Sequence, residues 1–312
     1  MNQFALDVRC GLTQSPQKEL PSKYLYDAIG STLFEAVTLL PEYGLTRADE
    51  RLLRQHAGEI IGRLPSPLIV AELGSGSGRK TRWILEALAR REFALYYAID
   101  VSGAGLAECV NQLGSLDSVR VVGLEATYFE GLREVVERRP DGENLLVLFL
   151  GSTFGNFDPP GQAHFLAEAR SLLSPGDAML LGTDLGKPEP VLIDAYDDAT
   201  GITAAFNLNL LGRINRELRA DFDLRCFQHE ARYNADERRI EMHLRSQADQ
   251  RVTIAEAELV CELSRGETIW TESSHKFDVD EVEAMAEEAG FSCAGQWVDE
   301  EWPFAESLFV VE

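Results

Sequence analysis

A glycine-rich stretch constrains the fold of this 312-residue chain more than any other feature. Residues 70–78 read Val-Ala-Glu-Leu-Gly-Ser-Gly-Ser-Gly, an apolar strand ending in alternate glycines, and a helical pattern begins near Lys80. Glycine allows a sharp turn and a close approach to a ligand, and the helix start offers free N–H groups. Asp100 ends the next apolar run, 22 residues past the last glycine, where a carboxylate accepts ribose hydroxyls. The pattern predicts a nucleotide-like ligand, and the alternative is a plain surface turn.

The spacing of the glycines discriminates between ligand classes. A dinucleotide fingerprint has the form G-x-G-x-x-G, whereas position 79 of this chain is Arg79. The G-x-G-x-G form preceded by Glu72 resembles the S-adenosylmethionine (SAM) loop of Rossmann-like methyltransferases, whose ligand has no pyrophosphate. This resemblance implies SAM as the cofactor and leaves the substrate open.

Composition narrows the classes of partner. The formal net charge of −23 opposes binding to nucleic acid or to an anionic membrane surface. The five cysteines form no C-x-x-C pair and the five histidines lack metal-ligand spacing, so we expect neither disulfides nor a metal site. Apolar runs are too short for a membrane span and the N-terminus has no signal-peptide core, which predicts a cytoplasmic protein. We expect a monomer that acts on a small molecule.

Strand and helix patterns alternate along most of the chain. Strands are predicted at 67–73, 94–100, 119–124, 144–150, 177–183, 291–299 and 306–311. Continuously apolar strands such as 144–150 are typical of parallel strands that are covered on both faces. The order predicts an α/β fold, a doubly wound, seven-stranded Rossmann-like methyltransferase sheet with right-handed crossovers.

Two regions fall outside this alternation. Residues 1–61 have helical and loop patterns, in which Thr46 and Asp49 resemble a capping box at a helix start. Residues 188–277 begin with a helical pattern and continue with alternating runs that are typical of antiparallel strands. We predict two domains: an inserted α+β substrate-binding lid of 1–61 and 188–277, and a SAM-binding domain of 62–187 and 278–312.

The chain resembles the histidine Nα-methyltransferases of ergothioneine biosynthesis over essentially its whole length. The similar segments, in the same order, are 24–31, 40–43, 72–81, 149–156, 181–185, 195–209, 215–218, 220–223, 239–242 and 272–274. The motifs of the inserted region are peculiar to that family. The resemblance implies an enzyme that methylates the α-amino group of L-histidine three times, giving Nα,Nα,Nα-trimethyl-L-histidine (hercynine).

The resemblance also implies which residues hold the cofactor. Gly74, Lys80 and Asp100 occupy the positions of cofactor residues in the family. Thr127 and Tyr128 depart from the pattern, since they stand where many members have Asp-Phe beside the adenine. We assign both to the cofactor site and expect backbone groups to share the adenine contact.

Substrate residues are implied in the same way. Tyr43, Asn156 and Tyr196 would hold the histidine backbone, the latter two at its carboxylate. Three side chains would read the imidazole: Glu272, Ser274 and Tyr26. Tyr43 and Asn156 are also the catalytic candidates, because they could direct the amine lone pair at the methyl group.

Without the resemblance, several of these positions have simpler interpretations. Tyr43 could equally be a buried aromatic residue, and Tyr196 is interpreted as a core residue. Asn156 has a turn cap as its alternative, although its segment favours function, and 271–277 is interpreted as a solvated loop. An alternative function is an N-methyltransferase of the same fold for another amino acid or small amine, although the acidic Glu272 disfavours a substrate such as tryptophan. A non-catalytic SAM-binding module or a nucleotide oxidoreductase is a further alternative.

Overall fold

A computed structural model describes residues 2–312, and this part of the chain divides into two compact units. One unit contains Leu45–Gly186 and Lys276–Glu312, and the other contains the chain up to Gly44 together with Lys187–His275. The first boundary differs from the predicted one at 61/62, because the helix Leu45–Gly62 packs against the sheet unit. The assignment of one unit to cofactor and the other to substrate stays a prediction.

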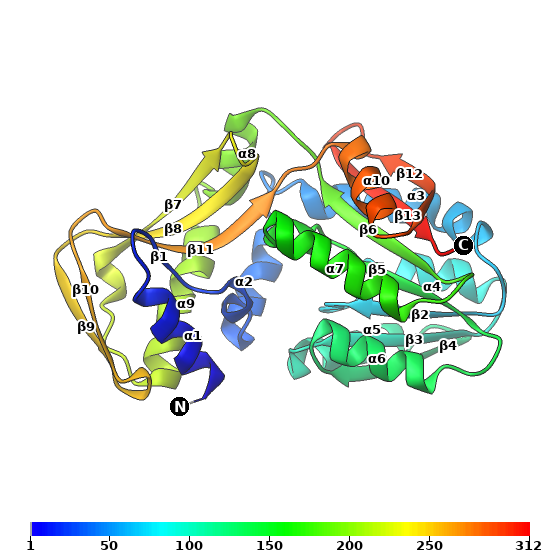
Figure 1. Ribbon diagram of the computed structural model, residues 1–312, viewed down its shortest axis with the longest axis horizontal. Helices are drawn as coiled ribbons and strands as arrows, with labels where there is room; N and C mark the ends of the chain where they lie inside the picture. Colours follow the sequence, from blue (N-terminus) through cyan, green and yellow to red (C-terminus); the bar gives the residue numbers. More distant parts are fainter. Residues whose placement is uncertain (1) are drawn as a thin grey trace. The chain divides into compact units, whose positions relative to one another are not determined.

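The first unit, which we call the sheet unit, is built on seven strands (Figure 1). They are β2 (Leu68–Leu73), β3 (Ala94–Asp100), β4 (Val119–Glu125), β5 (Asn144–Phe149), β6 (Ala178–Asp184), β12 (Ser292–Val298) and β13 (Phe304–Val310). Their order is β12-β13-β6-β5-β2-β3-β4; β13 is antiparallel to both neighbours, and the remaining pairs are parallel. The chain thus winds outward from β2 in both directions, which confirms the predicted doubly wound, seven-stranded sheet.

Helices cover both faces of this sheet. They are α3 (Leu45–Gly62), α4 (Arg82–Ala89), α5 (Gly103–Leu113), α6 (Tyr128–Arg138), α7 (Pro159–Leu172) and α10 (Val279–Glu288). Apolar side chains of α6, α7 and α10 form one core layer with Ile99, Phe149 and Phe309 of the strands. Neighbouring strand residues point to the opposite face, where Tyr96 meets Cys109 of α5. Burial on both faces explains why β2 and β6 are apolar runs without alternation.

The second unit, which we call the insertion unit, combines helices with antiparallel strands. Its elements are α1 (Gln3–Leu12), β1 (Lys18–Glu19), α2 (Ala28–Thr38), α8 (Glu189–Tyr196), α9 (Ile202–Leu218), β7 (Phe227–Asn234), β8 (Arg239–Ser246), β9 (Gln250–Ile254), β10 (Leu259–Leu263) and β11 (Thr268–His275). One sheet has the order β1-β11-β8-β7, and β9 pairs with β10. The antiparallel pairing of β7, β8 and β11 confirms the predicted strand character.

Three local predictions for the insertion unit need correction. The helical pattern from 188 splits into α8 and α9, because Gly201 takes φ +79° at the junction. The interpretation of 271–277 as a solvated loop is wrong, since most of it lies in β11. β1, which pairs in parallel with β11, was not expected.

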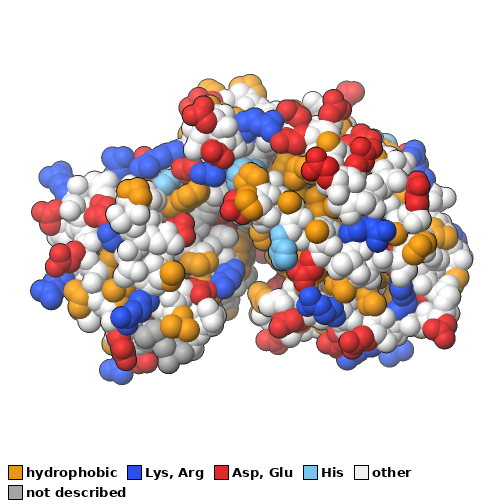
Figure 2. Space-filling view, viewed as in Figure 1, with side chains coloured by type: hydrophobic (Ala, Val, Ile, Leu, Met, Phe, Trp, Pro, Cys, Tyr) orange, Lys and Arg blue, Asp and Glu red, His pale blue; other side chains and the backbone are white. Residues whose placement is uncertain are grey.

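Charged side chains of both signs are interspersed over the face seen in Figure 2, although acidic residues exceed basic ones by 23. Such mixing is typical of a solvated surface. Among residues 2–312, every helix is too short or too polar to span a lipid bilayer.

Candidate active site

The glycine loop lies after β2, at the point where the sheet order reverses. β2 has β3 on one side and β5 on the other, and ligands of open α/β sheets bind outside the carboxyl ends of such strands. Gly74 takes φ +73°, and a Cβ there would lie 3.4 Å from the ring of Tyr128. At Gly78 a Cβ would lie 2.6 Å from the Cys109 sulfur. The backbone conformation at Gly74 and the close packing at Gly78 therefore require glycine.

Asp100 joins the end of β3 to this loop. Its Oδ2 accepts a hydrogen bond from Gly76 N at 2.9 Å, and its Oδ1 accepts one from Ser102 N at 2.8 Å. A carboxylate has about four acceptor positions, so two hydroxyl groups of a ribose can still be accommodated. The residues present therefore fit the adenosine part of SAM.

Tyr128 and Thr127 begin α6 beside the same loop. Burial, followed by the nearby Asp100 charge, raises the pKa of Tyr128 to about 12, so its phenol stays neutral. The Tyr128 ring packs edge-on against Phe149 at a centroid distance of 5.3 Å. The backbone N–H of Thr127 donates to Glu130 Oε2 at 3.2 Å as part of a capping box, and the Thr127 hydroxyl donates to the same oxygen at 2.6 Å. The capping role accounts for a threonine at position 127, and the adenine contact of Thr127 stays a prediction.

Lys80 follows the loop and forms an ion pair with Asp49, for which the sequence pattern predicted a helix-capping role. Its ammonium donates to Oδ2 of Asp49, which is fully buried in α3. The capping role predicted for Asp49 is wrong, because α3 already begins at Leu45 and the other carboxyl oxygen of Asp49 has no partner. An ion pair between partly exposed Lys80 and buried Asp49 therefore replaces the predicted cap.

Glu72 is a second buried carboxyl group beside the loop. Its Oε2 accepts hydrogen bonds from the hydroxyls of Thr81 and Tyr96, each at 2.5 Å. Burial raises the pKa of Glu72 to about 7, and these two hydrogen bonds oppose the rise. The group therefore titrates near neutral pH.

Replacing Glu72 by glutamine is expected to flatten the pH dependence of folding stability. Because the folded state binds the Glu72 proton more tightly, its contribution is fully present below pH 4.5 and is lost as the pH rises to about 7. The change amounts to roughly 3 kcal/mol. Glutamine keeps an acceptor for both hydroxyls but does not ionise. Thermal unfolding between about pH 5 and pH 8 measures the slope, and equal slopes for wild type and variant would refute this assignment.

Asn156 ends a short 3-10 helix (Thr153–Asn156) in the loop after β5. The loop is held at its start, where Gly151 N donates to Asp49 at 3.0 Å and Asp184 N donates to Ser152 Oγ at 2.8 Å. Ser152 takes a left-handed φ of 60°, which is uncommon for a residue with a side chain. Asn156 is thus carried by a tightly anchored loop of the sheet unit.

An aromatic cluster in the insertion unit contains three of the predicted substrate residues. Tyr43 contacts Tyr196 at a ring-centroid distance of 5.8 Å, and Phe34 lies 6.3 Å from Tyr43 and 5.4 Å from Tyr26. Phe206 completes the cluster, 5.5 Å from Tyr26. No role was predicted for Phe34 or Phe206, although Phe206 lies in one of the segments that resemble the family.

Glu272 and Ser274 reach the same cluster from β11. They are two residues apart, so both side chains point to one face of the strand, and both are buried. The Tyr196 and Ser274 hydroxyls are hydrogen-bonded at 2.8 Å, and the Tyr26 hydroxyl donates to Glu272 in a long hydrogen bond of 3.5 Å. The structure therefore brings together five predicted substrate residues: Tyr26, Tyr43, Tyr196, Glu272 and Ser274. Asn156 belongs to the sheet unit.

Tyr196 is held by hydrogen bonds to its backbone carbonyl as well as to its hydroxyl. Nε2 of the buried His229 donates to the Tyr196 carbonyl at 2.7 Å, and Nδ1 accepts from Asn207 Nδ2 at 2.9 Å. The carbonyl accepts only, which sets this tautomer. His229 read as an ordinary histidine in the sequence, and no local pattern distinguished it.

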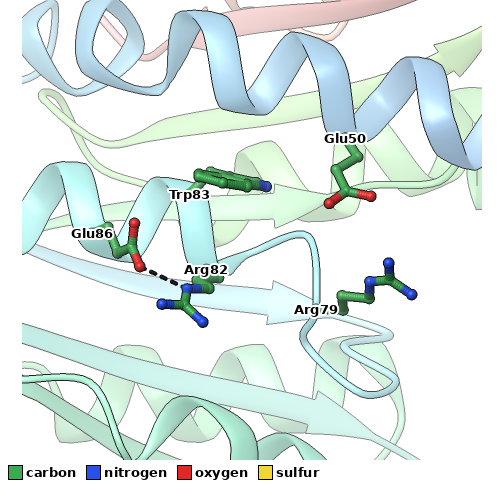
Figure 3. A pocket seen from close by; sticks show the side chains of 5 residues that line it. All are labelled: Glu50, Arg79, Arg82, Trp83 and Glu86. Atoms are coloured by element: carbon green, nitrogen blue, oxygen red, sulfur yellow. Dashed lines mark hydrogen bonds and ion pairs between the residues drawn. The ribbon is translucent and has the colours of Figure 1, made fainter.

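A pocket of about 300 Å³ is lined by residues of α3, α4 and the glycine-loop end (Figure 3). Its lining residues are Glu50, Arg79, Arg82, Trp83 and Glu86. Arg82 is paired with Glu86 at 2.6 Å, and none of the predicted site residues lines the pocket. It is therefore distinct from the groups assembled around Asp100 and around Glu272.

The doubly wound sheet, with its glycine loop after β2 held by Asp100, has the features of a Rossmann-like, SAM-dependent methyltransferase. Within that class, the chain belongs to the family described as histidine-specific, SAM-dependent methyltransferases, whose sequence profile matches residues 4–311. The resemblance stated from the sequence is thereby confirmed.

Individual relatives agree with the family match. Histidine N-alpha-methyltransferase of Mycolicibacterium smegmatis is 43% identical over 305 residues, covering 97% of this chain and 94% of that protein. The protein of the same name from Mycobacterium tuberculosis is 41% identical over 304 residues, covering 97% and 93%. Ergothioneine biosynthesis protein 1 of Neurospora crassa is 33% identical over 282 residues, covering 90% of this chain and 32% of that longer protein.

Proposed function

We propose that this protein transfers methyl groups from SAM to the α-amino group of L-histidine, three times in succession, to give Nα,Nα,Nα-trimethyl-L-histidine for ergothioneine biosynthesis. Family membership and near-full-length similarity to two histidine N-alpha-methyltransferases support the reaction. The structural observation that carries the proposal is the buried carboxylate of Glu272 within an aromatic cluster. Cytoplasmic location and a monomeric state stay predictions from the sequence.

The cofactor is assigned to residues of the sheet unit. Asp100 takes the ribose hydroxyls, Gly74 lets the backbone approach, and Tyr128 lies along the adenosine end. We assign the carboxylate of SAM to the Lys80 ammonium, because Lys80 stands at a cofactor position of the family and its positive charge can pair with a carboxylate. When bound, SAM supplies a methyl group on a positively charged sulfur, which is already activated for displacement.

The substrate is assigned to side chains with matching chemistry. Glu272 accepts an imidazole N–H, a charge-assisted hydrogen bond in surroundings that exclude water. The hydroxyl pair of Ser274 and Tyr196 offers further donors and acceptors, and the rings of Tyr26 and Phe206 surround a flat heterocycle. An apolar side chain such as that of leucine would bury the carboxylate of Glu272 further and offer it no N–H donor, which disfavours such a substrate.

Catalysis requires alignment more than chemical assistance. An amine with a free lone pair displaces sulfur in line, so the protein must hold the nitrogen unprotonated and pointed at the methyl carbon. We assign this orientation to Tyr43 and Asn156, with Asn156 and Tyr196 on the histidine carboxylate. Asn156 suits the task because its amide both donates and accepts.

Labelled SAM and a panel of amino acids test the proposal. We expect methyl transfer to histidine, with mass spectrometry detecting mono-, di- and trimethylated products in sequence. Methylation of another amino acid in preference to histidine would establish the alternative substrate. Failure to bind SAM would overturn the enzyme assignment itself.

A further inference from the structure

Two buried carboxyl groups lie beside Lys80, and neither belongs to the glycine motif. Asp49 comes from α3 and Glu306 from β13, which pack against each other, and each side chain is inaccessible to solvent. Glu306 Oε1 and Gly151 N, the group that donates to Asp49, lie 3.0 Å and 3.3 Å from the position of a Cβ on Gly182. The Asp49 Oδ2 accepts from the Lys80 ammonium and from Gly151 N at 3.0 Å. One carboxyl oxygen therefore binds both the lysine and Gly151, the second residue of the loop that carries Asn156.

Acceptors outnumber donors around this lysine. Asp49 Oδ1 and both carboxyl oxygens of Glu306 are buried and receive no hydrogen bond. A third carboxyl group, that of Glu72, also acts electrostatically on Lys80. Three ionised carboxylates around one ammonium would leave excess negative charge in a buried space, which is strongly unfavourable.

We propose that Asp49 and Glu306 share one proton, and that this carboxyl pair positions Lys80 and Gly151 for cofactor binding. A proton on Glu306 that is donated to Asp49 Oδ1 supplies the missing hydrogen bond and leaves Asp49 ionised opposite Lys80. Burial, followed by the charge of Asp49, raises the pKa of Glu306 well above its ordinary value, which agrees with a protonated group. The inference rests on the proposed function, because it takes Lys80 as a cofactor residue.

Gly151 shows how closely the lysine and the loop are packed. It takes φ +73°, and a Cβ at this position would lie 3.1 Å from Lys80 Nζ. Because Gly151 has no side chain, the Lys80 ammonium can pack against its backbone while Gly151 N donates to Asp49. Asp49 is thus a positioning residue that acts through Lys80 and through the loop leading to Asn156.

Binding of S-adenosylhomocysteine to the full chain, measured by calorimetry, tests the pair. Lys80→Ala is the reference variant, and we expect its affinity for S-adenosylhomocysteine to fall by about tenfold or more. Asp49→Asn should also lose about tenfold in affinity, because asparagine can accept from Gly151 N but removes the carboxylate that pairs with the ammonium and positions it. Glu306→Gln should stay within about threefold, since its amide N–H replaces the shared proton. Glu50→Gln, the neighbour of Asp49 that faces the pocket in Figure 3, is the matched control and should bind as wild type does.

The outcomes separate the two proposals. Unchanged binding by Lys80→Ala would remove Lys80 from the cofactor site and the pair's role with it. Weakened binding by Lys80→Ala together with unchanged or tighter binding by Asp49→Asn would leave the cofactor assignment standing and overturn the positioning pair. A loss in Glu306→Gln as large as that in Asp49→Asn would overturn the shared proton.

Infrared spectroscopy supplies a readout that a packing role would not change. A protonated carboxylic acid has its own carbonyl band, and we expect this band in folded wild type at about pH 8 and its loss in Glu306→Gln. The difference between the two spectra isolates Glu306 from Glu72. Identical spectra in the carboxylic-acid region would contradict the proposal, and thermal unfolding of each variant verifies that it is folded.

Discussion

Replacing Glu272 by alanine is expected to weaken histidine binding by roughly 10- to 150-fold, with the affinity for SAM nearly unchanged. The buried carboxylate offers a charge-assisted hydrogen bond to an imidazole N–H, worth about 1.5–3 kcal/mol. The proposed cofactor residues Gly74, Lys80 and Asp100 belong to the other compact unit, and the substitution removes none of the contacts described for them. Calorimetric titration of each ligand separately measures both affinities.

Two further variants sharpen the Glu272 experiment. Glu272→Gln keeps an acceptor without the charge and should lose less affinity than alanine does. Glu262→Ala removes an exposed acid from β10 in the same unit and should leave histidine binding unchanged. Equal losses of histidine and SAM in Glu272→Ala would contradict the imidazole role.

Asp100→Ala should have the reverse effect, with a loss of at least about tenfold in SAM affinity and near-normal affinity for histidine. The substitution removes the proposed acceptor of the ribose hydroxyls. It also releases Gly76 N and Ser102 N, whose hydrogen bonds hold the glycine loop to the end of β3. Both effects weaken cofactor binding, so the loss of SAM affinity should be among the largest caused by any single substitution.

Asp117 provides the control for Asp100. It is an exposed aspartate in the sheet unit, in the turn after α5, and Asp117→Ala should bind both ligands normally. Thermal unfolding of Asp100→Ala distinguishes a lost ligand contact from a damaged fold. Parallel losses of SAM and histidine together with a collapsed melting temperature would assign Asp100 to folding instead of cofactor binding.

The sheet and its cofactor loop could be predicted because their signals are local. β2, β5 and β6 are buried on both faces, so their residues form short apolar runs that are visible in the sequence. The glycines of the loop and Asp100 likewise fall at fixed distances from strand ends. The resemblance to a family then supplied the substrate residues, which no local pattern distinguished.

The remaining residues depend on contacts between distant parts of the chain. Ser274 looked like part of a solvated loop, yet it is buried against Tyr196, 78 residues away. Asp49 matched a capping pattern, but its carboxylate is used by Lys80, 31 residues away, because α3 packs on α4. Glu306 lies in a mostly apolar strand, and only the fold reveals its neighbours. In all three cases the role of the residue follows from the burial of its polar group, which only the fold shows.

A crystal structure of the protein with L-histidine and S-adenosylhomocysteine tests the substrate assignment most directly. We predict an imidazole nitrogen within about 3 Å of a Glu272 carboxyl oxygen and the α-amine directed at the cofactor sulfur. Histidine bound with its ring away from Glu272, or an amine pointing away from the sulfur, would contradict the account.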